Sequence, residues 1–153
     1  MNFVWTILGA ILITLVLAMC ITFFIVRPIL ARKVSKGALG LARELHGQPP
    51  LISTAASCEG VSDPDRMGLK GIGALALTEQ AVVFVSGDGE HTLVIPRDKI
   101  DEAGPATSVE ILGKTVRRPR PMLAVRWRNG HDVPLNTAFT LDDANTWTTA
   151  IAG

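Results

Sequence analysis

The chain contains few of the residues from which enzyme sites and metal centres are usually built. Its 153 residues include no tyrosine, three histidines and two cysteines. His46, His91 and His131 stand alone, and no pair of histidines or cysteines has the spacing of metal ligands. The sequence therefore predicts a protein without catalytic residues, without a metal and without a cofactor.

Charge is absent from the first 26 residues. The run from Phe3 to Val26 is almost entirely apolar, and Arg27 ends it. About 20 apolar residues cross a hydrocarbon core of ~30 Å, so the run predicts one transmembrane helix over residues 1–26. A cleaved signal peptide is the alternative. However, no basic residue precedes the run, the run is too long for a signal's apolar region, and no small-x-small site follows it. We therefore expect a permanent anchor.

Positive charge follows this run at once, because residues 27–50 carry five basic groups and one acidic group. Basic residues beside a membrane span stay on the cytoplasmic side. We therefore expect a single-pass protein of the cell (inner) membrane, with its amino terminus outside and everything after the anchor in the cytoplasm. A lone Cys58 agrees with a reducing compartment. The charges either set topology only or also bind anionic headgroups of the bilayer; the candidate lipid contacts are Arg27, Arg32, Lys33 and Lys36.

Small residues recur every fourth position along the apolar run. This spacing places them on one side of a helix, where two backbones can approach closely in lipid. It predicts an interface with a second copy of the chain or with a different membrane protein. The alternative is that threonine hydroxyls bond within their own helix. The candidate transmembrane interface consists of Thr6, Ala10, Thr14, Ala18 and Thr22.

Residues 27–50 also carry a helical pattern, and we expect them to form a basic juxtamembrane helix and linker. Gly37 and Gly40 weaken the predicted helix, and the Gly-Gln-Pro-Pro sequence at 47–50 ends it. The apolar residues of its predicted face are Leu30, Val34, Ala38, Leu41 and Leu45.

The remaining residues, 51–153, suffice for one domain with a modest core. Short apolar or alternating runs predict a mainly β structure, with turns at 86–90 and 129–130. Thr140 as cap and Asp143 three residues later predict a closing helix that presents Trp147 to the core. The predicted strands are 51–57, 72–77, 81–85, 92–95, 109–112, 122–128 and 132–135.

The apolar pattern in four parts of this region resembles the pleckstrin-homology-like (PH-like) superfold, most closely its bacterial PH-like and GRAM branches. The parts are residues 73–85, 93–100 and 123–130 and the closing helix around Trp147. The resemblance implies a bent, partly open β-barrel of about seven strands, closed at one end by the C-terminal helix.

The resemblance also implies binding of membrane lipid or of protein segments. Phosphoinositide-binding members carry clustered basic residues in and after the first hairpin. The matching residues here, 58–71, contain Glu59, Asp63 and Asp65 against only Arg66 and Lys70, which argues against that headgroup pocket.

A different basic region lies between Glu110 and Asp132, where the chain has no acidic residue. The RRPRP sequence at 117–121 is expected to be an extended loop, because each proline restricts its own backbone and that of its predecessor. The region can contact anionic lipid, an acidic protein surface or only water. Nucleic acid is not expected, because no aromatic residue interleaves with the arginines except Trp127, which should point inward. The candidate surface consists of Lys114, Arg117, Arg118, Arg120, Arg126 and Arg128.

Together these observations predict a membrane-anchored, non-enzymatic binding module, an accessory or scaffolding subunit of a membrane protein complex. The alternative is an anionic-lipid headgroup sensor, in which the anchor only localises the domain and the arginines read the lipid.

Overall fold

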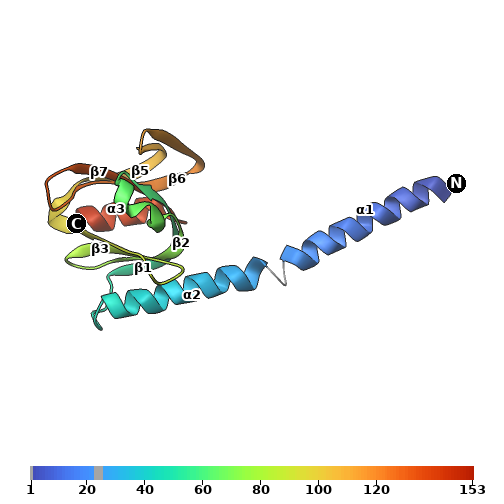
Figure 1. Cartoon of the computed structure of the whole chain (residues 1–153), viewed down its shortest axis with the longest axis horizontal. Coiled ribbons are helices and arrows are strands. Elements are labelled where there is room, and N and C mark those ends of the chain that lie inside the picture. The colour runs from blue at the N-terminus through green and yellow to red at the C-terminus, as the bar shows by residue number, and fades with distance from the viewer. Residues whose placement is uncertain (1, 23–25) are drawn as a thin grey trace. The chain divides into compact units, whose positions relative to one another are not determined.

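The computed structural model describes the backbone of residues 2–22 and 26–153 and the side chains of residues 7–8, 11–22, 26–66 and 69–153. The chain divides into two compact units, Met1–Arg32 and Lys33–Gly153 (Figure 1). Each is described by itself.

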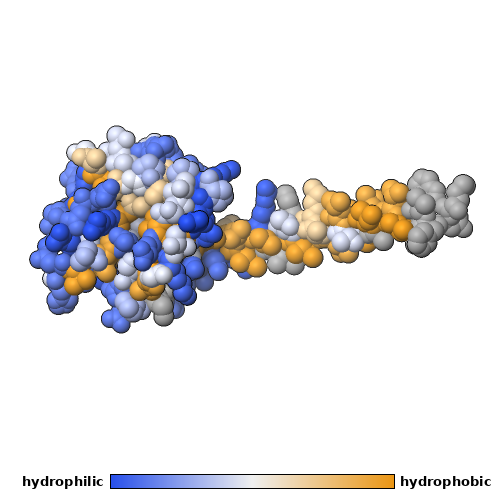
Figure 2. All heavy atoms as spheres, turned by 90° about the horizontal axis from the view of Figure 1, so that it is seen from above, coloured by the Kyte–Doolittle hydropathy of each residue, from blue (hydrophilic) through white to orange (hydrophobic). Residues whose placement is uncertain are grey.

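The first unit contains α1 (Asn2–Ile21) and the start of α2 (Arg27–Glu44). The described aliphatic side chains of α1 are exposed, from 47% for Ile7 to 69% for Met19. They form the apolar stretch along the helix in Figure 2. Among the described residues, no helix is both long and apolar enough to cross a membrane. The membrane-spanning role of residues 1–26 remains a prediction.

The second unit is built on one antiparallel sheet of seven strands, in the order β4-β3-β2-β1-β7-β6-β5. The first half of β1 pairs with β2, and its second half pairs with β7 across a bulge between Cys58 and Gly60. This double pairing curls the sheet into a half-barrel. The strands are β1 (Ile52–Val61), β2 (Gly71–Leu77), β3 (Ala81–Ser86), β4 (Thr92–Pro96), β5 (Ile100–Ile111), β6 (Lys114–Arg128) and β7 (Pro134–Thr140).

The inside of the curled sheet holds the main core. Alternate residues of each strand point inward, as the pleat requires, and α3 (Ala144–Ala152) lies between the two halves of the sheet (Figure 1). Trp127 and Trp147 are 2% and 3% exposed, which confirms the prediction that both side chains point into the core. The Trp127 indole N–H donates to Oγ1 of Thr137 at 3.0 Å, which satisfies the polar atom of this buried ring.

The outside of β2 and β3 is covered by α2. Ala74, Ala76 and Val83 face this side and form a second buried cluster with Leu41 of the helix. The sequence predicts that Gly37 weakens the helix, but in the structure Gly37 is a residue at which α2 lies close against the backbone of the sheet. A Cβ atom on Gly37 would lie 3.0 Å from the Ala74 amide nitrogen, so only glycine lets the helix approach this closely.

The helical face predicted for residues 27–50 is partly wrong. Leu41 is buried and Leu45 is half-buried, but Ala38 is exposed, and Gly37 takes its place against the sheet. From Lys33 onward the helix belongs to the same compact unit as the strands.

The cap of the last helix also differs from the expectation. Thr140 is the final residue of β7, and Asp143 caps α3 by accepting a hydrogen bond from the Thr146 amide at 3.1 Å. At the other end of the helix, the Arg97 guanidinium donates to the carbonyl of Ile151 at 2.7 Å. Arg97 lies in the turn between β4 and β5, so this contact fixes α3 at that corner of the sheet.

Four predicted strands have wrong boundaries. The strand predicted at 51–57 continues to Val61 in β1. The strand predicted at 109–112 is the end of the twelve-residue β5, and the strand predicted at 132–135 is β7, which begins at Pro134. The RRPRP sequence is part of β6 rather than a loop, although its register with β5 is irregular.

Candidate functional site

The β5–β6 hairpin extends beyond β7, the one strand that it pairs with in the described sheet, and folds back over the outside of the sheet. Between the pairs Ala106–Met122 and Ser108–Arg117, the four residues 118–121 lie opposite the single residue Thr107. Such an irregularity bends a hairpin sharply. We call residues 108–118 the hairpin arm.

Side-chain packing holds the hairpin arm against β1 and β7. Ile111 of the arm forms a small buried cluster with Met122 and Ala138, which face away from the main core. A Cβ atom on Gly60 would lie 3.3 Å from Cγ2 of Ile111, and the φ of Gly60 is +135°, so both space and backbone favour glycine there. The Asn136 amide also donates to the carbonyl of Glu110 at 3.4 Å.

An ion pair between the exposed Arg118 and the buried Glu59 connects the base of the hairpin arm to β1. Arg118 donates twice to the Glu59 carboxylate, at 3.2 and 2.6 Å, and the Thr140 hydroxyl donates to it at 2.8 Å. Glu59 is 6% exposed. Burial raises the pKa of the Glu59 carboxyl, but the hydrogen bonds from Arg118 and Thr140 and the charges of Arg118 and Lys70 outweigh that effect and lower the pKa below its ordinary value of 4.5.

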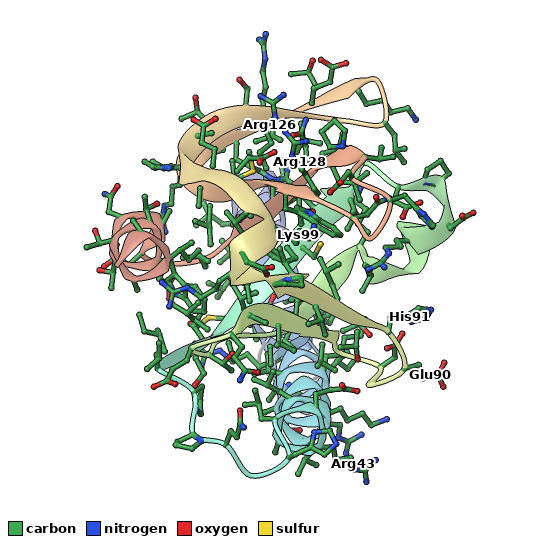
Figure 3. The ribbon with its side chains drawn as sticks, turned by 90° about the vertical axis from the view of Figure 1, so that its left-hand side faces the viewer. Arg43, Glu90, His91, Lys99, Arg126 and Arg128 are labelled. Carbon is green, nitrogen blue, oxygen red and sulfur yellow. The ribbon has the colours of Figure 1, made fainter. Side chains whose placement is uncertain are left out.

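The six predicted cations do not form one uniform surface. Arg118 is held by Glu59, and Arg128 donates to both oxygens of Asp101 at 3.1 Å. Arg126 lies opposite Glu102 in the β5–β6 register. Figure 3 shows Arg126 and Arg128 together on β6. The cations that make no ion pair with any residue the structure describes, and that have no acid opposite them in the strand register, are Lys114, Arg117 and Arg120.

An open pocket of about 220 Å³ lies where the hairpin arm meets β1. Aliphatic side chains of Ile111, Leu112 and Val116 line one part of it. Lys70, from the start of the β2 region, and Lys114 line another part. The Glu59 carboxylate is also present, but its oxygens are already engaged by Arg118 and Thr140. The available polar groups are therefore two ammonium groups beside an apolar lining. We call this the arm pocket.

A second hollow, of about 240 Å³, lies on the outer face of β5, β6 and β7. Its polar lining includes Glu102, Arg126 and Asn136. Because Glu102 and Arg126 carry opposite charges, this hollow lacks the net positive charge of the arm pocket.

The β3–β4 turn contains the strongest local acid. The Ser86 hydroxyl donates to Asp88, the Glu90 amide donates at 2.9 Å, and His91 Nδ1 lies 3.2 Å from the same carboxylate. These contacts lower the pKa of Asp88 to about 2, the Ser86 hydrogen bond most of all. Glu90 and His91 project outward from this turn in Figure 3. In the part of the chain that the structure describes, no three His, Cys, Asp or Glu side chains are placed to hold a metal ion.

The candidate transmembrane interface lies on and just after α1. The Thr22 hydroxyl donates to the carbonyl of Ala18 at 2.8 Å, a bond within one helical turn. Thr14 also has an interaction partner. The side chains of Thr6 and Ala10 lie outside the described residues. The candidate lipid contacts on α2 are all exposed: Arg27, Arg32, Lys33 and Lys36.

The curled seven-stranded half-barrel with its C-terminal helix is a PH-like fold. The sequence profile of the family described as bacterial PH domain-like matches residues 63–152, which is more than half of the chain. The chain belongs to this family. No curated protein and no solved structure matches it. PH-like domains commonly bind proteins or lipids and are typically not enzymes.

Sequence reasoning identified the cations but not their partners. Glu59 was counted only as an acid that disfavours a headgroup pocket, yet it fixes Arg118 from 59 residues away. No local pattern marks that pair. Lys70 was counted only as one of two basic residues in 58–71, and Leu112 only as the last residue of a predicted strand. The signal available for Leu112 was its place before Gly113, where a two-residue turn usually carries Asn or Asp.

Proposed function

We propose that this protein is a membrane-anchored binding module, an accessory or scaffolding subunit of a membrane protein complex that presents its PH-like domain on the cytoplasmic side. It acts by placement: a module held near its target by a short tether has a high effective concentration there, so weak contacts suffice.

The proposal of an anchor is supported by the exposed apolar surface of α1. A soluble helix normally buries one apolar stripe, whereas here the described aliphatic side chains, from Ile7 to Ile21, are all about half exposed or more. The uncharged run at 3–26 and the basic residues that follow it agree with this interpretation. This exposed surface is the observation that carries the proposal.

The proposal of a protein partner is supported by the distribution of charge on the hairpin arm. Two of the six predicted cations are neutralised by Glu59 and Asp101, and a third lies opposite Glu102. Of the three cations that remain, Lys114 lines the arm pocket beside its aliphatic side chains. A cationic site with aliphatic neighbours fits an amphipathic protein segment better than a purely polar headgroup.

The alternative function is an anionic-lipid sensor, and the exposed basic residues of α2 favour it. Lys33, Lys36 and Arg43 are exposed on a helix that is packed against the sheet. Each basic residue near an anionic surface contributes about 1 kcal/mol to membrane attraction.

The anchor is tested by fractionation of native membranes followed by extraction with alkaline carbonate. We expect the tagged full-length protein to remain in the membrane pellet, as an integral protein does. Release into the carbonate supernatant would contradict the anchor.

The partner is tested by copurification of the tagged protein in mild detergent with mass spectrometry. We expect a stoichiometric membrane protein that is lost when Thr6, Ala10, Thr14, Ala18 and Thr22 are all replaced by Leu. The matched control is Leu12→Ala with Val16→Ala, on the opposite side of the same helix, which should retain the partner. Recovery of the protein alone, or with itself, contradicts a hetero-complex.

The lipid alternative is tested with Arg117→Glu and Arg120→Glu together. Arg118 is left unchanged because its replacement would also break the pair with Glu59. If the arm reads anionic lipid, the double variant loses the salt-sensitive interaction of the domain with nanodiscs containing phosphatidylglycerol. If the interaction of the double variant with the nanodiscs is unchanged, the arm does not act as a sensor of anionic lipid.

A further inference from the structure

We propose that the arm pocket is a recognition site for an acidic protein segment that carries a large apolar side chain. This inference rests on the proposed function, because it names the part of a membrane partner that the PH-like domain binds. The apolar side chain would occupy the space lined by Ile111, Leu112 and Val116, and the neighbouring carboxylates would meet Lys70 and Lys114.

The size of the pocket indicates a side chain as its occupant. Pockets that enclose a complete small ligand usually measure about 300–1,000 Å³, and the arm pocket measures about 220 Å³. A lipid headgroup has the matching charge but would exchange water for aliphatic carbon on one side, without new hydrogen bonds. An amphipathic peptide segment meets both the lysines and the aliphatic lining.

The charges that line the arm pocket indicate the charge of the protein segment that binds there. The carboxylate that lines the pocket, Glu59, is neutralised by Arg118 and carries a lowered pKa for that reason among others. Lys70 and Lys114 make no ion pair with any residue in the described part of the chain. The site is therefore positive overall and selects an acidic partner.

Leu112 provides an independent reason to assign binding to this place. Leu112 and Gly113 form the two-residue turn between β5 and β6, with φ of +51° and +70°. Both central residues of such a turn have positive φ, which favours Asn-Gly or Asp-Gly. Leu112 is the one aliphatic residue with positive φ in the described part of the chain. It is also 41% exposed. A leucine here is unfavourable both for the backbone and for solvation, and contact with an apolar partner side chain explains its presence.

The test uses the full-length protein in dodecyl maltoside micelles and fluorescent heptapeptides with blocked ends. Each peptide in the main set carries a central Leu or Phe flanked by Asp and Glu. One reference set has Ser at the centre, and another has Lys in place of the acids. Fluorescence anisotropy gives the dissociation constants at low and at physiological salt.

Three variants and a control locate the binding. Lys70→Glu with Lys114→Glu should weaken binding of the main set roughly tenfold or more, because two attractive contacts become repulsive. Leu112→Asn should weaken binding about fivefold through lost apolar contact while it favours the turn, so a misfolded variant is not the explanation. Val116→Ser tests the lining in the same way. The control Arg43→Glu reverses an exposed charge on α2, in Figure 3 at the opposite end of the unit from Arg126, and should change binding by less than about twofold.

Several outcomes would overturn the inference. One is that no peptide of the main set binds at millimolar concentration. Others are that the Ser-centred set binds equally well, or that the pocket variants bind as the unchanged protein does. Protection of the hairpin arm from hydrogen exchange in phosphatidylglycerol nanodiscs but not in phosphatidylcholine nanodiscs, without peptide binding, would assign the surface to lipid instead.

The failure of this inference can be distinguished from failure of the proposed function. If a partner copurifies and the pocket variants retain it, the accessory role stands and the pocket assignment is wrong. If the pocket binds acidic, apolar peptides as expected but no partner copurifies, the pocket assignment stands and the accessory role is wrong.

Discussion

Replacing Gly37 by alanine tests whether α2 is locked to the sheet by close backbone contact. In a helix interior, glycine to alanine normally stabilises by about 0.5–1 kcal/mol. Here the new Cβ atom would lie 3.0 Å from the Ala74 nitrogen and 3.2 Å from the Val85 oxygen. These two residues are partners in the β2–β3 ladder, so neither backbone atom can rotate away.

We therefore expect Gly37→Ala to destabilise the protein, although helix preference alone would make the change stabilising. Overpacking costs about 1–3 kcal/mol, and the helix can limit that cost by lifting off, which exposes Leu41, worth about 1.5–3 kcal/mol. We expect Gly37→Ala to lower the free energy of unfolding by about 1–2 kcal/mol. With a urea slope of about 1–3 kcal/mol per M, the midpoint falls by roughly 0.3–2 M.

The assay is urea unfolding of the full-length protein in detergent, followed by fluorescence of Trp127 and Trp147 in a Trp5→Phe background. Ala42→Gly on the exposed side of α2 is the control and should cost about 0.5–1 kcal/mol by helix preference alone. Gly37→Ala and Leu41→Ala should combine to less than their sum, because both weaken the same docking. A higher midpoint for Gly37→Ala would refute the close-contact argument.

Three further predictions follow from the same geometry. Glu59→Gln should lower stability at pH 7 by about 0.5–1.5 kcal/mol, because the exposed Arg118 guanidinium and the half-buried Thr140 hydroxyl lose a charged acceptor. Since the pKa of Glu59 is lowered in the folded state, its contribution is present above pH 4.5 and is lost as pH falls through the folded pKa. The unchanged protein should therefore lose more stability on acidification than the variant, and parallel acid unfolding curves would contradict this. Leu112→Asn should raise the free energy of unfolding by about 0.5–1 kcal/mol, because asparagine tolerates the positive φ better than leucine; a lower thermal midpoint would count against the assigned strain. In a Cys20→Ser background, Cys58 should resist maleimide at pH 8 until the protein is denatured, because burial raises the pKa of its thiol to about 12. Labelling is measured by mass. Rapid labelling of the native protein would show that the Cys58 thiol is accessible.

The apolar pattern of the strands was sufficient to predict the sheet and its inward face. In the strand predicted at 122–128, alternation placed Leu123, Val125 and Trp127 inside, and all three are buried. The same reasoning gave the last helix and the position of Trp147. These features depend on local periodicity, which a single sequence displays.

The docking of α2 was missed although the sequence contained a signal for it. Residues 81–85 are apolar without interruption, and all five are buried. A strand that is apolar on both faces needs a cover on both faces. The Ala-Leu alternation of residues 74–77 indicates the same, with small residues beneath a close-packed helix. Glycine was instead counted only by its helix preference, which packing overrode.

The hairpin arm was not predictable from local pattern. Pro119 and Pro121 suggest a loop, and the structure places them in the bulge that bends the hairpin. The ion pair between Glu59 and Arg118 joins residues that are distant in sequence, and its geometry depends on the assembled sheet. Sequence reasoning could therefore identify a cationic region but not which cations were already neutralised.

The double pairing of β1 affects how the chain is made. Cys58 pairs with Phe139, 81 residues later, so β1 waits for its second neighbour while the intervening chain is synthesised, roughly 4–16 s at ~5–20 residues per second. During that interval the first four strands can pair only as a local meander, with one side of β1 unpaired. A message or a protein cut short before residue 134 retains this open edge permanently, and an unpaired edge recruits other strands. Truncated products of this chain therefore expose a strand edge that the full-length protein covers with β7.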